Sequence, residues 1–354
     1  MSQAAVFLNP GEMIDRLQTM ASLEAFSHLT GEAVLVVDLA HAEAATRSAS
    51  EIETTCNALS QLPCPTIGIG PPEATQSGRA IAPHLDVMLD HRAQVDLVLS
   101  GIERSPMAAA SLVQLLRMNE SLDIHKGLIA ESLVYSMLQS GPEFGAWLTR
   151  YRAAHPAKSD QKSGDAPRPE PAVRIQRNGD RLGLTLNRPE RRNAFSIEMR
   201  DGLIEGLAVA ATDPSLAEVV LSGEGAAFCS GGDLDEFGTL PDPSTAHAIR
   251  SARNAGRLLA ECAARVRVEV HGACIGAGIE LPAFASRIVA RPESFFALPE
   301  VSMGLVPGAG GTTSIPRRIG RQRTAWWALT GARIDTQTAL DWGLIDEIAD
   351  EVAA

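Results

Sequence analysis

The sequence predicts an α/β fold whose strands run largely parallel. Short runs of β-branched residues alternate with segments of helical spacing, and glycine-rich turns separate several of these strand and helix pairs. The chain has 354 residues, of which 45% are hydrophobic and 21% charged. This composition is typical of a globular protein, and the length allows one large domain or two of about 150 residues each.

A segment of low apolar content divides the chain. Between Ala154 and Pro171 the apolar periodicity stops, and Pro, Ser, Lys and Asp accumulate. We therefore expect a first half over residues 1–154, a flexible linker over 155–171 and a second half over 172–354.

The periodicity of the second half predicts its elements in order. Asn178 and Gly179 separate two alternating runs and predict a β-hairpin over residues 173–187. Helical spacing and β-branched runs then predict a helix over 196–211, a strand over 218–222, a helix over 245–264, a strand over 266–270, a helix over 279–285 and a strand over 287–290.

The first half contains similar elements in the same order. They are strands over 33–39, 65–70 and 85–89 and a helix over 52–59. This order indicates an internal duplication, for which chance recurrence of common α/β elements is the alternative. Residues 105–153 differ from the rest, because they contain two amphipathic helices whose apolar faces need a partner.

Charge and the lack of targeting signals narrow the classes of function. The net charge of −12 and the 4% aromatic content argue against a nucleic-acid partner, which needs basic and stacking side chains. We find no run of about 18 apolar residues and no signal peptide, so we expect no membrane partner. The five cysteines show no metal-ligand spacing, and we expect reduced packing residues in a cytoplasmic protein without a bound metal.

Two glycine-rich turns of the second half can bind an anionic oxygen. One contains Gly231 and Gly232, and the other contains Gly276 and Gly278 on either side of Ala277. The first N–H groups of a helix have no partner inside the helix, so a turn that opens a helix can direct an N–H towards an anion. Two such donors that converge form an oxyanion hole, although glycine turns also serve tight packing alone.

Two glutamates accompany these turns. Glu280 lies three residues after Ala277, almost one helical turn, so its carboxylate can share a face with that residue's amide. Glu300 follows a strand end and precedes the glycine-rich sequence VPGAGG. A lone glutamate on a turn is usually solvated, whereas paired carboxylates can act as general acid and general base.

Four segments of the second half occur in a characteristic order. They are LNRPERRNAFS at 186–196, AAFCSGGDLDEF at 226–237, HGACIGAGIELPAF at 271–284 and LPEVSMGLVPGAGGT at 298–312. In this order and spacing they resemble the crotonase, or enoyl-CoA hydratase/isomerase, family over about residues 172–349. The resemblance implies an α/β fold with a crotonase-like spiral of ββα repeats, which the similar first half would duplicate.

The resemblance implies a role for the turns and the glutamates. The amides of Gly232 and Ala277 would bind the thioester oxygen of an acyl-CoA and stabilise an enolate. Glu280 would activate water and Glu300 would transfer a proton at the α-carbon, which together hydrate a 2-enoyl-CoA or catalyse the reverse dehydration. The resemblance implies no cofactor apart from the coenzyme A of the substrate, and it implies a homo-oligomer, a trimer or a hexamer.

The same resemblance implies substrate-binding residues. Arg191 and Arg192 fall where the family places basic residues near the CoA phosphates, and simple exposure is the alternative for both. Ala194 and Gly308 belong to the same expected substrate-binding set. Asp233 follows the first glycine turn, and we expect it to cap the next helix rather than to react.

The sequence departs from the family in its terminal helices. Members of the family usually continue past a segment of this kind, whereas this sequence ends at GLIDEIADEVAA. Residues 105–153 resemble the family's terminal helices instead. We hypothesise that the first half is a degenerate crotonase-like unit whose helices at 105–153 stand in for the missing ones, within one chain or across a subunit contact.

Several related functions stay open at this point. An oxyanion hole also supports enoyl-CoA isomerisation and the lyase or oxygenase chemistry of other crotonases. A degenerate first half is also compatible with a noncatalytic CoA-binding assembly protein. We expect residues 237–250, Trp326 and Trp327 to line the acyl pocket, whose substrate the sequence leaves undetermined.

Overall fold

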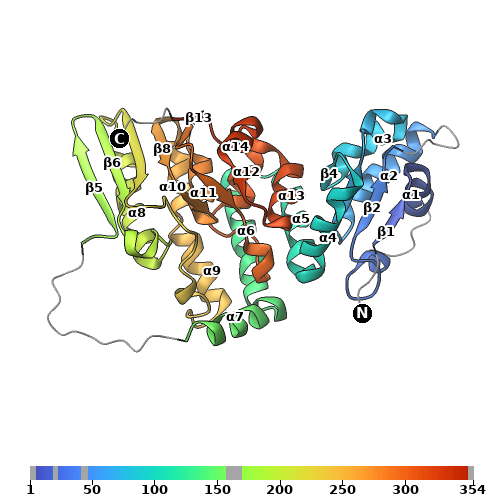
Figure 1. Cartoon of the computed structure of the whole chain (residues 1–354), viewed down its shortest axis with the longest axis horizontal. Helices are drawn as coiled ribbons and strands as arrows, with labels where there is room; N and C mark the ends of the chain where they lie inside the picture. Colours follow the sequence, from blue (N-terminus) through green and yellow to red (C-terminus); the bar gives the residue numbers. More distant parts are fainter. Residues whose placement is uncertain (1–4, 19–22, 41–46, 157–169, 350–354) are drawn as a thin grey trace.

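The computed structural model describes residues 5–18, 23–40, 47–156 and 170–349. It is an α/β structure with mainly parallel strands, which confirms the predicted fold class (Figure 1). Residues 157–169, the greater part of the expected linker, lie outside the described residues. Within the described ranges no helix is long and apolar enough to cross a membrane.

A four-stranded parallel sheet forms the N-terminal part of the chain, up to residue 104. Its strands lie in chain order: β1 (Val6–Leu8), β2 (Leu35–Asp38), β3 (Thr66–Ile69) and β4 (Val87–Leu89). The helices around it are α1 (Pro10–Gln18), α2 (Ala49–Gln61), α3 (Gln76–Ile81) and α4 (Val95–Arg104). Because side chains alternate along a strand, Leu35 and Val37 pack with α1 to α3, whereas Val36 packs towards α4 and the rest of the chain.

A six-stranded sheet forms the centre of the C-terminal part, residues 170–349. Its order is β13-β10-β8-β7-β6-β5, and only β5 runs antiparallel to its neighbour. The bounds are β5 (Val173–Asn178), β6 (Arg181–Leu186), β7 (Glu218–Gly223), β8 (Val266–Val270), β10 (Arg287–Ala290) and β13 (Glu347–Ile348). The predicted hairpin is confirmed, with Asn178 paired to Arg181. The strands β6, β7, β8 and β10 are parallel neighbours, as β1 to β4 are. The internal duplication stays a prediction.

A smaller sheet and seven helices complete this part. The sheet has the order β12-β11-β9 and contains β9 (Ala273–Ile275), β11 (Phe295–Ala297) and β12 (Ile334–Asp335). The helices are α8 (Ile197–Thr212), α9 (Pro243–Ala252), α10 (Ala255–Cys262), α11 (Ala277–Glu280), α12 (Gly311–Ile319), α13 (Arg321–Thr330) and α14 (Thr336–Trp342). The expectation of one helix over 245–264 is wrong, because the helix is interrupted between α9 and α10. There the Asn254 side chain accepts a hydrogen bond from the Arg257 amide at 2.9 Å and caps α10.

Three helices, rather than the two expected, occupy residues 105–153. They are α5 (Pro106–Asn119), α6 (Ile124–Gln139) and α7 (Pro142–Ala154). Gly141 and Pro142 separate α6 from α7, since proline is favoured in the first turn of a helix but does not continue the one before it. α6 packs against α9 and α12, and α5 packs against α12 and α13 (Figure 1). The apolar faces of these helices therefore find their partner in the C-terminal part of the same chain.

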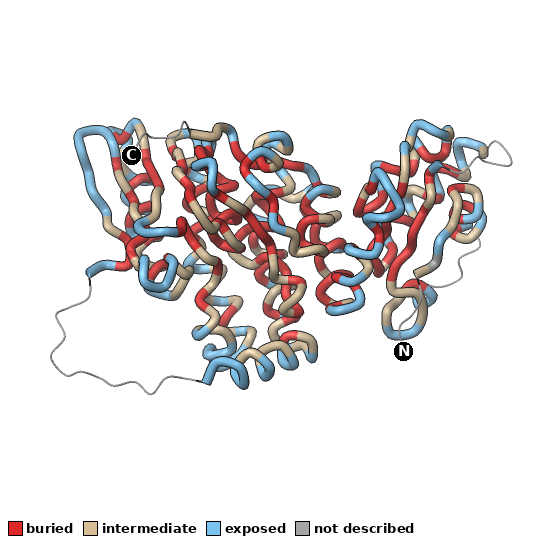
Figure 2. The backbone as a smooth tube through the Cα atoms, in the orientation of Figure 1, coloured by how far each residue is buried: buried red, intermediate tan, exposed pale blue. Residues whose placement is uncertain are grey.

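One apolar core connects the N-terminal and C-terminal parts (Figure 2). It extends from one face of β2 to β4 through α4, α5 and α6 into the six-stranded sheet. Asp86, which is 1% exposed, lies at this junction. Its Oδ1 accepts hydrogen bonds from the Arg117 Nε at 2.8 Å and from the Arg321 Nη1 at 3.0 Å. The carboxylate thus joins the N-terminal sheet to α5 and α13.

We expect Asp86→Ala to lower the free energy of unfolding by about 3–5 kcal/mol, because the substitution removes the buried carboxylate that the Arg117 and Arg321 guanidinium groups share. As a control, Glu261→Ala removes a surface ion pair with Arg257 and should cost less than about 1 kcal/mol. Urea denaturation followed by circular dichroism measures both values. Equal losses in the two variants would show that the Asp86 cluster does not stabilise the junction.

Candidate active site

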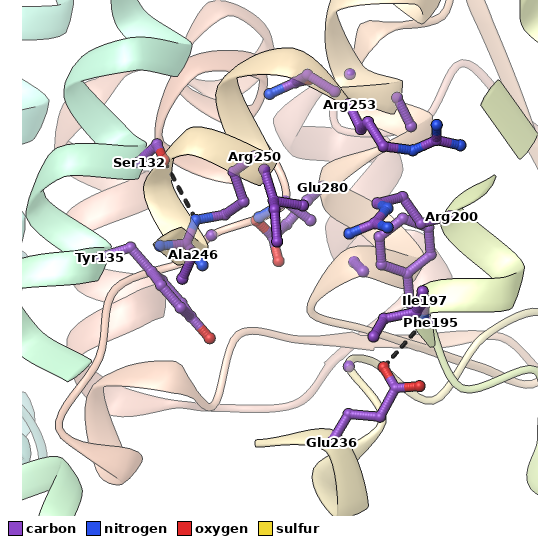
Figure 3. A pocket seen from close by; sticks show the side chains of 18 of the residues that line it. Ser132, Tyr135, Phe195, Ile197, Arg200, Glu236, Ala246, Arg250, Arg253 and Glu280 are labelled. Atoms are coloured by element: carbon purple, nitrogen blue, oxygen red, sulfur yellow. Dashed lines mark hydrogen bonds between the residues drawn. The ribbon is translucent and has the colours of Figure 1, made fainter. Parts of the chain in front are cut away.

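A cavity of about 210 Å³ lies between α6, α9 and the two glycine-rich turns. Five residues singled out from the sequence line it together: Gly232, Ala277, Glu280, Glu300 and Gly308. Figure 3 shows side chains of α6 on one side of the cavity and side chains of α9 beside them. Helix α6 and the C-terminal part therefore contribute to one cavity.

Backbone hydrogen bonds hold the two glycine-rich turns side by side. The Cys229 amide donates to the Ala273 carbonyl at 3.1 Å, and the Ile275 amide donates to the Cys229 carbonyl at 3.0 Å. A β-carbon at Gly278 would lie 2.4 Å from the Cys229 carbonyl oxygen, so glycine is needed for this close approach. The segments that lead into the two turns therefore form a single short ladder.

The amides of Gly232 and Ala277 are available to a ligand. Neither N–H donates a hydrogen bond to any described residue. Ala277 is the first residue of α11, where a helical N–H has no acceptor one turn earlier. Gly276 has a φ of 51°, in the left-handed region that favours glycine, and turns the chain from β9 into α11. Both amides belong to residues that line the cavity, which is one condition for an oxyanion hole.

Glu280 is 2% exposed and lies at the end of α11. Its Oε2 accepts hydrogen bonds from the Ala309 amide at 2.7 Å and from the Gly311 amide at 2.9 Å. Burial raises the pKa of Glu280 to about 7, although these two hydrogen bonds oppose the rise. This carboxyl group can therefore exchange a proton near neutral pH.

Glu300 begins a short 3₁₀ helix (Glu300–Met303) next to the turn at Gly276. A β-carbon at Gly276 would lie 2.4 Å from the Glu300 Oε1, so the missing side chain makes room for the carboxyl group. The Glu300 Oε2 is buried and has no hydrogen-bond partner among the described residues. Burial, and then the charge of Glu280, raise the pKa of Glu300 well above its ordinary value.

A third carboxyl group, that of Glu131 on α6, lies at the same site, and sequence reasoning does not single it out. Its Oε1 accepts a hydrogen bond from the Gly310 amide at 2.7 Å, and its Oε2 accepts one from the Thr312 amide at 2.9 Å. Burial, and then the charge of Glu280, raise the pKa of Glu131 to about 8. The one signal in the sequence is its place three residues after Leu128, on the apolar face of α6.

Glu131 and Glu280 together cap the N-terminus of α12. The amides of residues 309–312 donate in alternation, the first and third to Glu280 and the second and fourth to Glu131. A helix start offers unpaired N–H groups and a partial positive charge, and both favour carboxylates. The loop that contains Gly308 is thus held by α6 and by α11 of the C-terminal part.

The other three expected substrate-binding residues do not line the cavity. Arg191 donates to the Asp233 Oδ1 at 3.1 Å and also pairs with Asp235. Arg192 is exposed and Ala194 is half-buried. The role of these three residues in CoA binding stays a prediction. The Asp233 side chain also accepts a hydrogen bond from the Asp235 amide at 3.1 Å and caps the short helix that follows, as expected.

The expected pocket lining is confirmed in part. The residues between 237 and 250 that line the cavity are Phe237, Thr239, Leu240, Ala246, Ile249 and Arg250. The expectation for Trp326 and Trp327 is wrong, since neither lines the cavity. Trp327 is fully buried, and its indole N–H donates to the Ala332 carbonyl at 2.8 Å. Both tryptophans belong to α13, which packs against α4, α5 and α12.

Comparison with curated proteins finds relatives of the C-terminal part. A family model described as enoyl-CoA hydratase/isomerase matches residues 180–353. The chain is 34% identical to 1,2-epoxyphenylacetyl-CoA isomerase of Escherichia coli K12 over 174 residues, which are 48% of this chain and 66% of that protein. It is 35% identical to 2,3-dehydroadipyl-CoA hydratase of the same organism over 167 residues, which are 47% of this chain and 65% of that protein. Each match therefore spans just under two thirds of the curated relative.

Solved structures include similar proteins. An enoyl-CoA hydratase from Thermoplasma volcanium is 30% identical, with 52% of this chain and 74% of that chain covered and a TM-score of 0.48. An enoyl-CoA hydratase from Mycobacterium smegmatis is also 30% identical, with 51% and 70% covered and a TM-score of 0.48. By the family match over residues 180–353 and the identities to these curated relatives, this part of the chain belongs to the enoyl-CoA hydratase/isomerase, or crotonase, family.

Proposed function

We propose that the chain adds water to a 2-enoyl-CoA thioester or catalyses the reverse dehydration. The observation that carries this proposal is that one cavity is lined by two residues whose amides donate to no described residue, Gly232 and Ala277, and by two buried carboxyl groups, those of Glu280 and Glu300. The names of two relatives, a hydratase and an isomerase of CoA thioesters, support the same class of substrate.

The amides of Gly232 and Ala277 bind the thioester carbonyl oxygen in this proposal. Attack of water at C3 moves negative charge onto that oxygen and produces an enolate. Two N–H groups that are already oriented stabilise this charge without reorganisation, and loss of one such donor typically costs about 3–4 kcal/mol in the transition state. No cofactor is needed beyond the coenzyme A that the substrate carries.

Glu280 and Glu300 divide the proton transfers. Glu280 takes a proton from water as the water oxygen bonds to C3, and the C2–C3 π electrons move towards the thioester. Glu300 then gives a proton to C2 as the carbonyl re-forms, and the product is a 3-hydroxyacyl-CoA. At neutral pH, a base with a pKa of about 7 and an acid with a pKa well above the ordinary value suit these two roles. Proton exchange with solvent returns both groups to their starting states.

Isomerisation of an enoyl-CoA is a second candidate. It requires one carboxyl group that moves a proton between two carbons. Glu300 suits this task, because its Oε2 has no hydrogen-bond partner among the described residues. Glu280 instead accepts two amide hydrogen bonds through one oxygen. The two activities are separable, since hydration requires Glu280 as well as Glu300.

We expect Glu280→Gln and Glu300→Gln each to lower kcat for crotonyl-CoA hydration by about 10²–10⁴-fold, because each variant loses one proton transfer. The decrease in enoyl-thioester absorbance measures the rate, and Glu261→Gln, outside the cavity, is the control. With a 3-enoyl-CoA, isomerisation should depend on Glu300 far more than on Glu280. Full hydration activity in either cavity variant would remove that residue from the mechanism.

The pKa values of the two glutamates predict the pH dependence of hydration. Glu280 acts as a base, so kcat/KM should rise as the pH increases through about 7 and this carboxyl group ionises. Glu300 acts as an acid, so the rate should fall at higher pH, where it loses its proton. Initial rates with crotonyl-CoA across the neutral range measure both limbs. A rate that increases as the pH drops below 7 would contradict the role of Glu280 as the base.

Glu131 is a positioning residue in this scheme, because it holds the loop that also binds Glu280. We expect Glu131→Ala to lower kcat by up to about 10²-fold through displacement of that loop. The charge of Glu131 contributes to the raised pKa of Glu300, so its removal should shift the falling pH limb to lower pH.

Glu143→Ala is the matched control for Glu131→Ala. Glu143 also caps a helix, since its carboxylate accepts hydrogen bonds from the Met107 and Ala108 amides of α5, but it does not line the cavity. Its loss should lower the thermal unfolding midpoint and leave the pH limbs in place. If Glu131→Ala likewise lowers the thermal unfolding midpoint but leaves kcat and the pH limbs unchanged, Glu131 is a structural cap and not a positioning residue.

A further inference from the structure

Arg250 is a cationic side chain on the wall of the cavity. It lies near the end of α9 and reaches towards α6 (Figure 3). Its Nε donates to the Ser132 hydroxyl at 3.2 Å, and its Nη2 donates to the Ser136 hydroxyl. Its guanidinium carbon is 4.7 Å from the centre of the Tyr135 ring, which is a cation–π contact. These contacts hold the guanidinium group between the two helices that border the cavity.

Among the described arginines that line the cavity, Arg250 is distinguished by hydrogen-bond partners that are all neutral. Arg200 and Arg253 each bind Asp201, with nitrogen–oxygen distances of 2.8 and 2.9 Å. Arg250 forms no ion pair with any described residue. Its hydrogen-bond partners are two hydroxyl groups and the Gln139 side-chain amide.

Arg250 retains donor capacity for a ligand. A guanidinium group has five N–H donors, and the Arg250 Nη1 reaches only the Gln139 Oε1, at 3.4 Å. Glu131 does not supply the missing anion, because both of its oxygens accept hydrogen bonds from the start of α12. Burial disfavours the charged form and lowers the pKa of Arg250. A carboxylate would relieve this cost through the two parallel hydrogen bonds that match the guanidinium fork.

The acidic residues of the cavity repel the carboxylate of a ligand less than ionised carboxylates would. Burial raises the pKa of Glu131 to about 8, that of Glu280 to about 7 and that of Glu300 well above its ordinary value. The raised pKa values favour the neutral form of these groups, so they repel an anion less than fully ionised carboxylates would. Asp233 is paired with Arg191, and Glu236 accepts a hydrogen bond from the backbone at 2.9 Å.

We propose that Arg250 binds a carboxylate at the distal end of the acyl group, so that the preferred substrates are CoA thioesters of dicarboxylic acids. This inference rests on the proposed function, which places the thioester at Gly232 and Ala277 in the same cavity. The cavity volume of about 210 Å³ is smaller than the roughly 300 Å³ at which pockets for a whole ligand begin, so it suits an acyl chain rather than the CoA nucleotide. Arg250 is then a specificity-determining residue.

Binding of saturated thioesters tests this inference without any chemical step. The ligands are glutaryl-, adipyl- and pimelyl-CoA, each compared with its monomethyl ester, and isothermal titration calorimetry gives the Kd. For at least one chain length we expect the acid to bind the full-length protein about 10- to 100-fold more tightly than the ester. Arg250→Gln should reduce this preference to less than about threefold, and Arg250→Lys should keep part of it.

Arg257→Gln is the matched control, because Arg257 lies on α10, pairs with Glu261 and does not line the cavity. It should keep the full preference for the acid. If Arg250 only tethers α9 to α6, Arg250→Gln should weaken the binding of acid and ester by the same factor.

Two outcomes would overturn the inference about Arg250 and leave the proposed function intact, provided that the protein still hydrates crotonyl-CoA. They are equal Kd values for acid and ester at every chain length in the unmodified protein, and a preference that survives in Arg250→Gln. If the unmodified protein binds neither acids nor esters and does not hydrate crotonyl-CoA, the proposed function fails together with the inference.

Discussion

Two buried glutamates share the N-terminus of α12, and this shared cap joins the two parts of the chain at the site. Glu131 comes from α6, which precedes the C-terminal part, and Glu280 comes from α11 within that part. Their alternating hydrogen bonds fix the loop around Gly308, and that loop forms part of the cavity wall. Helix α6 is therefore a component of the site, since without it the loop would lose half of its side-chain anchors.

Burial gives this cavity its chemical character. Desolvation raises the pKa of Glu280 to about 7 and that of Glu131 to about 8, so these two groups can exchange protons near neutral pH, and it raises the pKa of Glu300 well above its ordinary value. A guanidinium group cannot respond in the same way, because its ordinary pKa is too high for burial to neutralise it. Arg250 thus keeps its charge, although its hydrogen-bond partners are all neutral. The cavity combines acids poised for proton transfer with one cation that lacks a protein counter-ion among the described residues.

The residues that sequence reasoning located belong to local patterns. Gly232 and Ala277 lie in glycine turns whose backbone geometry is specified within a few residues, and Glu280 lies one helical turn beyond Ala277. Arg191 does not belong to such a local pattern. The two carboxylates with which it pairs, and which compete with its predicted role in CoA binding, lie 42 and 44 residues away in the sequence. The break between α9 and α10 depends on a single asparagine cap within an otherwise helical pattern, which apolar periodicity does not reveal.

The sequence by itself determined the α/β class, the two glycine turns and the pair of glutamates beside them, because these features follow from short-range periodicity and backbone preference. Only the tertiary structure decided that α6 completes the cavity, since the Glu131 contacts span 179 and 181 residues. It also decided that Arg250 meets hydroxyl groups more than 110 residues earlier and no carboxylate of the described chain. Contacts at such separations arise from how whole helices pack, and no local propensity encodes them.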